Sequence, residues 1–455
     1  MTEALDYARE NRQRFLDELK TFLRIPSISA QPEHAPDVRE AASWVRDRLL
    51  EAGFPRADVM PTKGHPIVIG EWLGADSDAP TVLVYGHYDV QPPDPVEAWD
   101  SPPFEPTRRG DSLHARGASD DKGQLYIHIK AAEALGAADA PLPVNLKVII
   151  EGEEEIGSPS FGSFVHEHRE LLSADYAVIS DTHILGADLP SIVYALRGLA
   201  YLEVTVTGPD HDLHSGIYGG AVNNPINALC RMIAQLQDPD GHITIPGFYD
   251  RVRDLAPEER RELAKVPFDR GEWLKETGAP EAWGEKAYTI IECTSARPTL
   301  DVNGIWGGYT EPGAKTVLPS SAHAKISMRL VPDQTPEEIS SLVTRYLHDI
   351  APPTVSVEVR DLHGGSAAIV DRDSPAMQAA SRAYAETFGR EPVFVREGGS
   401  IPVVATFQEE LGIETVLMGF GLPDDRLHSP NEKFHIPNFY RGIETVIRFL
   451  QLLGE

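Results

Sequence analysis

The stretch TVLVYGHYDVQP at residues 81–92 carries the main fold signal of this sequence and its first chemistry. Its first part, TVLVY, is a short run of β-branched and apolar residues, which is typical of a strand buried on both faces of a sheet. His87 and Asp89 follow directly, and their spacing of two places them on one side of an extended segment. Open α/β sheets bind ligands beyond the carboxyl ends of their strands. The stretch therefore predicts an α/β sheet with a functional site at this strand end.

Strands of the same kind recur on both sides of this stretch and alternate with helical patterns. Alternation of this kind indicates a sheet with helices on both faces, here a mixed and mostly parallel one. The expected strands are IVIGEWL (67–73), LKVII (146–150) and YAVIS (176–180), and the expected helices cover residues 3–24, 36–52, 121–136 and 159–172.

After Arg197 the pattern changes from continuous apolar runs to strict alternation, as in YLEVTVTG (201–208). A β-α-β-β-α-β order follows, which predicts an inserted α+β domain with one exposed sheet face. Within it, the charged segment 238–290 fits no motif, and we expect only helical turns around residues 256–265. The predicted organisation is a catalytic α/β domain of residues 1–196 and 365–455, interrupted by an inserted lid domain of residues 197–364.

Composition excludes several classes of protein. The 455 residues contain 41 Lys and Arg against 70 Asp and Glu, so the formal net charge is −29, and nucleic acid or anionic membranes are not expected partners. Cys230 and Cys293 form no metal or disulfide pattern. The N-terminus lacks a secretory pattern, and no apolar run approaches the ~20 residues of a membrane span. We expect a cytoplasmic protein.

Four further segments place acidic residues or histidine near strand ends. Each has an ordinary explanation when taken alone, such as a helix cap, a solvated acidic run or a loop histidine. Taken together they bring mixed nitrogen and oxygen ligands to one sheet edge, a set that suits Zn²⁺ or Mn²⁺. Two divalent ions, three carboxylates and a bridging hydroxide also balance in charge, as a co-catalytic pair for hydrolysis requires. The residues are Asp120 and Asp121, Glu154 and Glu155, Asp181, and His428.

The ordered segments GHYDVQP, RGASDDKG, EGEEEIGS, ISDT and LHSPNEKF resemble the motif set of the M20 metallopeptidase family. The resemblance runs from RIPSIS at 24–29 to the final helix. It implies one metal held by His87, Asp120 and Asp181, and a second held by Asp120, Glu155 and His428, with Asp120 bridging the two. It also implies that Glu154 is the general base, that Asp89 orients His87, and that the peptide bond after Asp120 is cis.

Further segments resemble the branch of cytosolic nonspecific dipeptidases and carnosinases, namely HSGIYGG (214–220), GAKTVLP (313–319), ISMRLVP (326–332) and REGGSIPV (396–403). The resemblance implies that His214 reaches the active site of a partner subunit as an oxyanion donor, in a homodimer made through the inserted domain. It implies that Arg329 binds the carboxylate of a short peptide substrate. Thr316, Gly399 and Ser400 would help to seat the substrate backbone.

Two other functions fit the same residues. An N-acyl-amino-acid deacylase or desuccinylase could use the same two-metal site, because specificity resides in the lid and the pocket. A non-catalytic metal-binding or peptide-binding protein is a different class, but Glu154 and all of the expected ligands are present. The sequence does not distinguish Zn²⁺ from Mn²⁺, and it fixes neither the side-chain preference nor the role of segment 238–290.

Overall fold

The computed structural model describes residues 2–399 and 401–455, and the chain forms two compact units. Unit 1 comprises Met1–Tyr194, Val370–Val395 and Thr406–Glu455, and unit 2 comprises Ala195–Ile369 and Arg396–Ala405. We expected residues 396–405 in the catalytic domain. They belong to unit 2 because the Arg396 side chain pairs with Glu259, and because Arg197 Nε donates to the Gly398 carbonyl at 3.2 Å.

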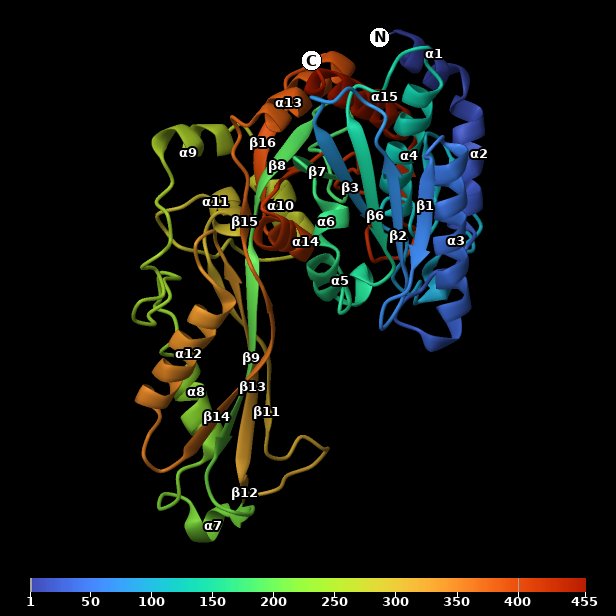
Figure 1. The fold of residues 1–455 in the computed structure, drawn as a ribbon. Coiled ribbons are helices and arrows are strands. Elements are labelled where there is room, and N and C mark those ends of the chain that lie inside the picture. Colours follow the sequence, from blue (N-terminus) through green and yellow to red (C-terminus); the bar gives the residue numbers. More distant parts are fainter. Residues whose placement is uncertain (1, 400) are drawn as a thin grey trace. The chain divides into compact units, whose positions relative to one another are not determined.

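A nine-stranded sheet, most of which lies in unit 1, confirms the predicted mixed α/β fold (Figure 1). Its strands lie in the order β1-β2-β6-β3-β7-β17-β8-β15, and β16 pairs with β8. Their bounds are β1 Arg56–Met60, β2 Ile67–Trp72, β3 Thr81–His87, β6 Asn145–Glu151, β7 Tyr176–Ile179, β8 Ser191–Leu196, β15 Ala368–Ile369, β16 Val393–Glu397 and β17 Glu414–Leu417.

The parallel pairs lie in the middle of this sheet. Strand β3 runs parallel to β6 and to β7, and β17 runs parallel to β7. The pairs β1·β2, β2·β6, β8·β17 and β8·β15 are antiparallel, so less of the sheet is parallel than we expected. The short link between β1 and β2 permits only a hairpin, whereas helix α4 (Lys122–Gly136) provides the crossover that a parallel β3–β6 pair requires.

Helices cover both faces of the sheet (Figure 1). Successive side chains of a strand point to opposite faces, so a single strand contacts the helices on both sides. On β3, Val84 lies with Leu125 and Ile129 of α4 on one face, together with α3 (Ala35–Glu51) and α15 (Ile436–Leu453). Tyr85 lies on the other face, where its ring contacts Phe161 of α5 (Phe161–Glu167) and Phe407 of the π turn η4 (Phe407–Leu411). Both faces of β3 are therefore buried, as its continuous apolar run predicted.

Two predicted helices are each interrupted. The helix expected at 3–24 is α1 (Thr2–Glu10) and α2 (Arg12–Leu23), and the Asn11 side chain between them donates to the Tyr7 carbonyl at 2.9 Å. The helix expected at 159–172 is α5 and α6 (Arg169–Leu172), separated by His168, whose Nδ1 bonds the Phe164 carbonyl at 2.9 Å. In both places the carbonyl accepts from the side chain and also from the backbone N–H of the same residue, at 3.1 Å for Asn11 and 3.0 Å for His168. The prediction of single helices was wrong.

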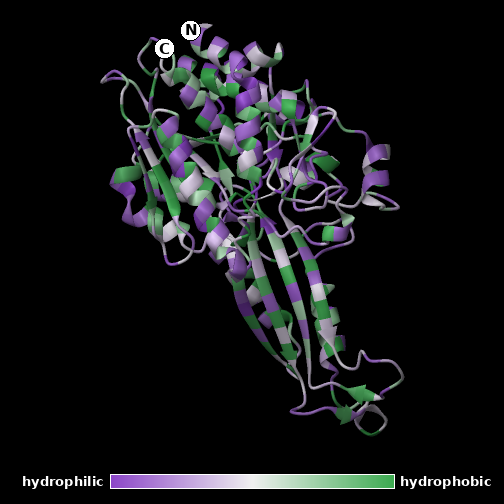
Figure 2. Ribbon diagram, turned by 90° about the vertical axis from the view of Figure 1, so that its right-hand side faces the viewer, coloured by the Kyte–Doolittle hydropathy of each residue, from purple (hydrophilic) through white to green (hydrophobic). Residues whose placement is uncertain are grey.

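Unit 2 contains a four-stranded antiparallel sheet in the order β11-β13-β9-β14, with α8 (Pro225–Ile233) and α12 (Pro336–Ile350) on one face. The strands are β9 Gly198–Thr207, β11 Thr299–Gly307, β13 Ser321–Leu330 and β14 Ser356–Gly365. Buried residues alternate with partly exposed ones along β9 and β13, and Figure 2 shows this as bands of opposite hydropathy along the long strands. This confirms a sheet with one open face. Segment 238–290 contains α9 (Pro257–Leu263), which was expected, and α10 (Arg270–Thr277), which was not.

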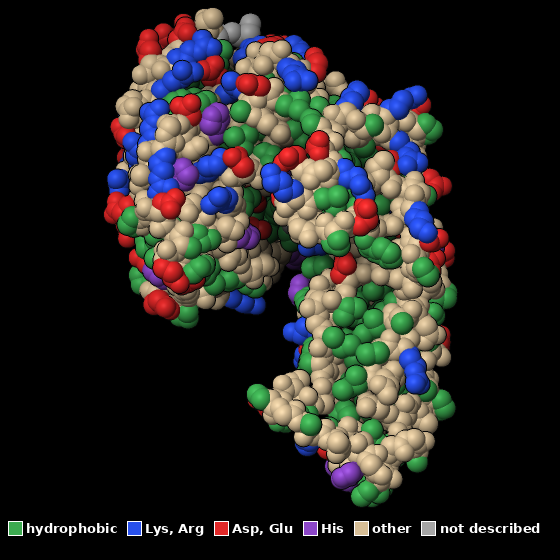
Figure 3. Space-filling model, turned by 180° about the vertical axis from the view of Figure 1, so that it is seen from behind, with side chains coloured by type: hydrophobic (Ala, Val, Ile, Leu, Met, Phe, Trp, Pro, Cys, Tyr) green, Lys and Arg blue, Asp and Glu red, His purple; other side chains and the backbone are tan. Residues whose placement is uncertain are grey.

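The surface carries charges of both signs. Figure 3 shows acidic and basic side chains interspersed on the face that it draws. None of the helices in the described part of the chain is long and apolar enough to cross a membrane.

Candidate metal centre

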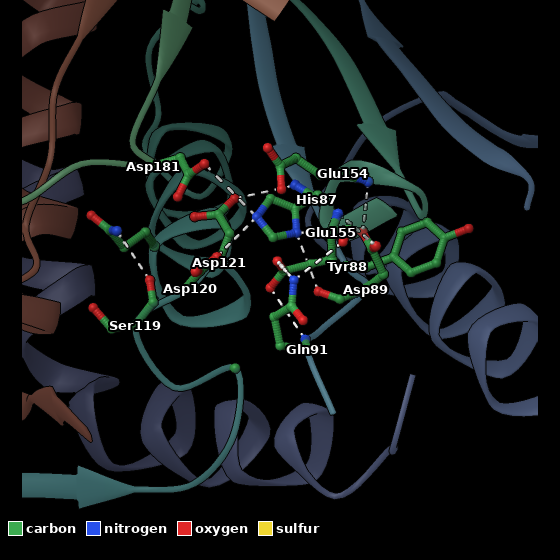
Figure 4. Close-up of polar contacts among 12 residues, drawn as sticks. His87, Tyr88, Asp89, Gln91, Ser119, Asp120, Asp121, Glu154, Glu155 and Asp181 are labelled. Carbon is green, nitrogen blue, oxygen red and sulfur yellow. Dashed lines mark hydrogen bonds and ion pairs between the residues drawn. The ribbon is translucent and has the colours of Figure 1, made fainter. Parts of the chain in front are cut away.

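The carboxyl ends of three parallel strands bring the predicted ligands together in unit 1. His87 ends β3, where it lies beside Glu151, the last residue of β6. Glu154 and Glu155 lie in η3 (Glu154–Ile156), the turn that follows β6, and Asp181 follows β7 by two residues. Figure 4 shows the side chains of Glu154, Glu155 and Asp181 around the His87 imidazole. Parallel pairing therefore produces the cluster, because it aligns the ends of strands that are far apart in sequence.

The first group of possible ligands is His87, Asp120 and Asp181. His87 Nε2 lies 3.1 Å from Asp120 Oδ1 and 3.8 Å from Asp181 Oδ2. The His87 ring is fully buried, and its Nε2 has no hydrogen-bond partner among the described residues. A buried polar nitrogen without a hydrogen-bond partner costs free energy unless another group interacts with it. A metal ion bound among these three side chains would do so.

The second group is Asp120, Glu155 and His428. His428 Nε2 lies 2.9 Å from Asp120 Oδ2 and 3.2 Å from Glu155 Oε2. Since Asp120 offers Oδ1 to the first group and Oδ2 to the second, its carboxylate is arranged to bridge two ions. The Asp120–Asp121 peptide bond is cis, as the resemblance implied.

Contacts between histidines and carboxylates shift the pKa values of Asp120 and His428. Burial opposes ionisation of Asp120, but the hydrogen bond from His428 and the neighbouring His87 imidazole lower its pKa below the ordinary value. The bonds to Asp120 and Glu155 raise the pKa of His428 to about 10. The metal-free centre therefore holds protons that metal ions would displace, since a metal ligates the deprotonated imidazole.

Glu154 lies beside both groups but belongs to neither. Burial raises its pKa to about 8, and the neighbouring charges of Asp181 and Glu155 act in the same direction. Bound cations would lower this pKa. A carboxylate whose pKa is tuned towards neutrality is suited to accept and return a proton.

Asp89 connects His87 to the turn that carries the glutamates. Its two carboxylate oxygens accept from the backbone N–H groups of Glu154 at 3.3 Å and Glu155 at 3.1 Å. His87 Nδ1 lies 3.2 Å from the Asp89 carbonyl and 3.4 Å from Asp89 Oδ1. Asp89 thus lies where it can fix both the imidazole and the glutamate turn.

Sequence reasoning missed one residue that holds a candidate ligand. Gln91 Nε2 donates to Glu155 Oε2 at 2.8 Å, and Gln91 N donates to Glu155 Oε1 at 3.2 Å. Gln91 lies two residues after Asp89, within the first motif, so the motif itself contained the signal.

The predicted substrate residues lie in unit 2. The structure brings His214 and Thr316 together, because β10 (Leu213–His214) pairs with β12 (Val317–Leu318), and Ser215 N donates to the Thr316 carbonyl. His214 and Thr316 are exposed, Arg329 is half-buried on β13, and Gly399 is exposed. Ser400 lies outside the described residues.

The donor set fits two divalent ions. Each group has one imidazole and two carboxylates, and the ligand atoms within a group lie within 4.8 Å of one another. Nitrogen and oxygen ligands without thiolates suit Zn²⁺ or Mn²⁺.

Comparison with known proteins gives one family. Residues 83–452 match the model of peptidase family M20/M25/M40. The chain is 33% identical to a Cys-Gly metallodipeptidase of Candida albicans, over 99% of this chain and 96% of that protein. It is 32% identical to the beta-Ala-His dipeptidase of Homo sapiens, over 100% of this chain and 93% of that protein.

A solved structure supports the same assignment. An M20 family metallo-carboxypeptidase from Sulfolobus solfataricus superimposes with a TM-score of 0.85 at 33% identity, covering 97% of this chain and 99% of that one. The family match covers most of the chain, and both curated relatives exceed 30% identity over nearly its full length. The chain belongs to peptidase family M20/M25/M40 and is an enzyme of the M20 metallopeptidase type.

Proposed function

We propose that this enzyme is a dipeptidase that hydrolyses dipeptides or very short peptides with two divalent metal ions, Zn²⁺ or Mn²⁺. The observation that carries the proposal is the pair of ligand groups that share Asp120, with Glu154 beside them. The names of the two curated relatives, a Cys-Gly and a beta-Ala-His dipeptidase, support dipeptides as the substrate class.

His87, Asp120 and Asp181 would hold one ion, and Asp120, Glu155 and His428 would hold the other. When bound, the two ions supply the Lewis acidity that polarises the peptide carbonyl and lowers the pKa of the attacking water. Glu154 accepts a proton from that water and returns it to the leaving amine. Asp89 holds the His87 imidazole and the Glu154 turn in position through its hydrogen bonds to both.

Arg329 would bind the terminal carboxylate of the substrate. A guanidinium suits this task because its planar fork matches a carboxylate. Arg197 lies just before β9, two residues ahead of Leu199, the register partner of Arg329. Burial and the charge of Arg329 lower the pKa of Arg197 to about 10. An anion bound by Arg329 would relieve this repulsion between two guanidinium groups.

We also propose that the enzyme is a homodimer formed through unit 2, in which His214 serves the active site of the partner. Gly216 N donates to His214 Nδ1 at 3.0 Å, so a neutral His214 carries its proton on Nε2 and can donate it to an oxyanion. Strand β11 lies at an edge of its sheet and exposes Val302, Ile305 and Trp306. Figure 3 shows hydrophobic side chains gathered on the part of the surface that the sheet and helices of unit 2 form.

A cytoplasmic location would suit the two cysteines. Cys230 and Cys293 both carry free thiols. Unpaired thiols are typical of a reducing compartment, whereas secreted proteins favour disulfides.

The test is amide hydrolysis by protein stripped with a chelator and then reloaded with Zn²⁺ or Mn²⁺. The panel comprises unblocked dipeptides, longer peptides, and N-acetyl and N-succinyl amino acids. We expect metal-dependent cleavage confined to the shortest unblocked peptides. Release of C-terminal residues from longer peptides would instead favour a carboxypeptidase, like the Sulfolobus relative. Cleavage confined to acylated amino acids would favour a deacylase.

His214→Ala tests the role across subunits. We expect a loss of about 10²–10³-fold in kcat, the usual cost of removing an oxyanion donor, with metal content unchanged. Mixing His214→Ala with Glu154→Gln should restore part of the activity, because a mixed dimer contains one intact site. Unchanged turnover in His214→Ala, or full activity of a monomer in sedimentation, would contradict the proposal.

A further inference from the structure

Glu432 is a fully buried carboxylate that belongs to neither group of metal ligands. Its Oε1 accepts from the backbone N–H groups of Ser119 at 2.9 Å and Asp120 at 3.2 Å. Its Oε2 accepts from Gly117 N at 3.0 Å and from Arg116 Nη1 at 2.7 Å. One side chain therefore accepts hydrogen bonds from three backbone N–H groups of the short segment that carries Asp120.

We infer that Glu432 is a positioning residue for the metal centre: it fixes Asp120 relative to His428 so that one carboxylate can serve both ions. This inference rests on the proposed two-metal centre. The direction of the Asp120 side chain depends on its backbone, and Glu432 bonds the N–H of that same residue. Because both ligand groups use Asp120, a shift of this segment would misplace a ligand of each ion.

The loop that carries His428 is attached to the Asp120 segment on both sides of the histidine. Glu432 follows His428 by four residues. Asp425 precedes it by three, and its Oδ2 accepts from Ser119 Oγ at 2.9 Å and from Leu422 N at 2.7 Å. Strand β18 (Lys433–His435) then pairs with β5 (Ser112–His114), just before the Asp120 segment. These contacts set the position of His428, whose ring is 56% exposed and is therefore held little by packing.

Arg116 extends the same arrangement to the first motif. Its guanidinium, 1% exposed, pairs with Glu432 and also donates to the Pro92 carbonyl at 3.2 Å. The preceding residue, Gln91, holds Glu155. The Arg116–Glu432 pair thus joins the loops that supply Asp120 and His428 to the Gln91–Pro92 segment, which in turn holds Glu155.

A purely structural ion pair would behave differently, and the chain offers a matched control. Glu133 is also a nearly buried carboxylate, and it accepts from Lys130, Arg14 and Tyr7. These partners are side chains of α1, α2 and α4, and none is a ligand or adjacent to one. Loss of either carboxylate should reduce stability, because each removes a carboxylate partner of a buried cation, Arg116 or Lys130. Only the loss of Glu432 should reduce metal affinity.

The experiment compares Glu432→Gln with Glu133→Gln in the full chain. A glutamine at position 432 keeps the shape but presents an amide N–H where Gly117 and Arg116 also donate. The two Zn²⁺ dissociation constants are measured on chelator-stripped protein by competition with a chromogenic chelator, below the thermal midpoint of each variant. We expect both constants to rise about 10–100-fold in Glu432→Gln, as is usual when a group that supports a metal ligand is removed. We expect wild-type constants in Glu133→Gln.

Wild-type Zn²⁺ constants in Glu432→Gln, with a thermal midpoint lowered as in Glu133→Gln, would overturn the inference and leave a structural ion pair only. If Glu432→Gln does not fold, Glu432→Asp serves, since it keeps the charge but withdraws the carboxylate by one methylene. Its Zn²⁺ constants should then rise by a smaller factor, and unchanged constants would overturn the inference. Failure of the wild-type protein to bind two Zn²⁺ ions would overturn the proposed centre itself and this inference with it.

Discussion

The two ligand groups of the centre share Asp120 but are built in different ways. The first group takes its histidine from the end of the central strand β3, where the His87 ring is completely buried. The second takes His428 from a loop, where the ring is 56% exposed and the backbone has a φ of 57°. Such a left-handed conformation is uncommon outside glycine and persists only where surrounding contacts impose it.

The difference indicates that sheet packing would position one ion and loop contacts would position the other. In the first group, burial of the strand fixes the imidazole. In the second, the hydrogen bonds of Glu432 and Asp425 hold the loop. We therefore expect the first ion to be held more rigidly and the second to exchange more readily with solvent.

Because Glu154 belongs to neither group, its replacement should affect hydrolysis without affecting metal binding. In Glu154→Gln, both ions should stay bound, because no ligand is lost. Hydrolysis should fall by about 10²–10⁴-fold, the usual contribution of a general base, because an amide cannot accept the proton. Steady-state kinetics together with metal analysis measure both effects. Activity within tenfold of wild type would remove Glu154 as the base.

Replacing each histidine tests the contrast between the groups directly. His87→Ala and His428→Ala should each lower the metal content from two ions to one, since each removes one ligand of one group. His87→Ala should also lower the thermal midpoint of the metal-free protein, because it empties a fully buried position. His428→Ala should lower that midpoint less, because it loses the ion pairs with Asp120 and Glu155 but leaves no buried cavity, its ring being 56% exposed. Equal losses of stability in the two variants would contradict the contrast.

Proton release gives the smallest and most specific effect. At pH 8 the metal-free His428 is protonated, because Asp120 and Glu155 raise its pKa to about 10. Zn²⁺ binding must displace that proton, so affinity should fall as the pH is lowered. Calorimetry in buffers of different ionisation enthalpy measures the number of protons released. His428→Ala should release about one proton fewer than wild type, and equal release would show that His428 is not a ligand.

The sequence was sufficient for the parts of the site that regular structure creates. His87 and Asp181 follow buried apolar runs, and parallel strands align their ends, so their convergence could be predicted. His428 is one of sixteen histidines, and only the ordered motif set singled it out. Glu432 escaped notice, because its function consists of contacts with backbone groups more than 300 residues away in sequence.

The breaks in two helices could not be predicted from the sequence pattern. Helical periodicity continues through Asn11 and His168, yet a single side-chain hydrogen bond at each position accompanies the break. The placement of residues 396–405 in unit 2 depends on the Arg396–Glu259 and Arg197–Gly398 contacts, which link segments distant in sequence. No periodicity in the chain signals such pairings.

The proposed centre requires that Asp120 bridge two metal ions. Anomalous diffraction at the zinc edge, from crystals of the full chain grown with Zn²⁺, tests it most directly. We expect two anomalous peaks about 3.5–4 Å apart with the Asp120 carboxylate between them. One peak should lie against His87 and Asp181, and the other against Glu155 and His428. A single peak, or two peaks that do not share Asp120, would contradict a centre bridged by Asp120.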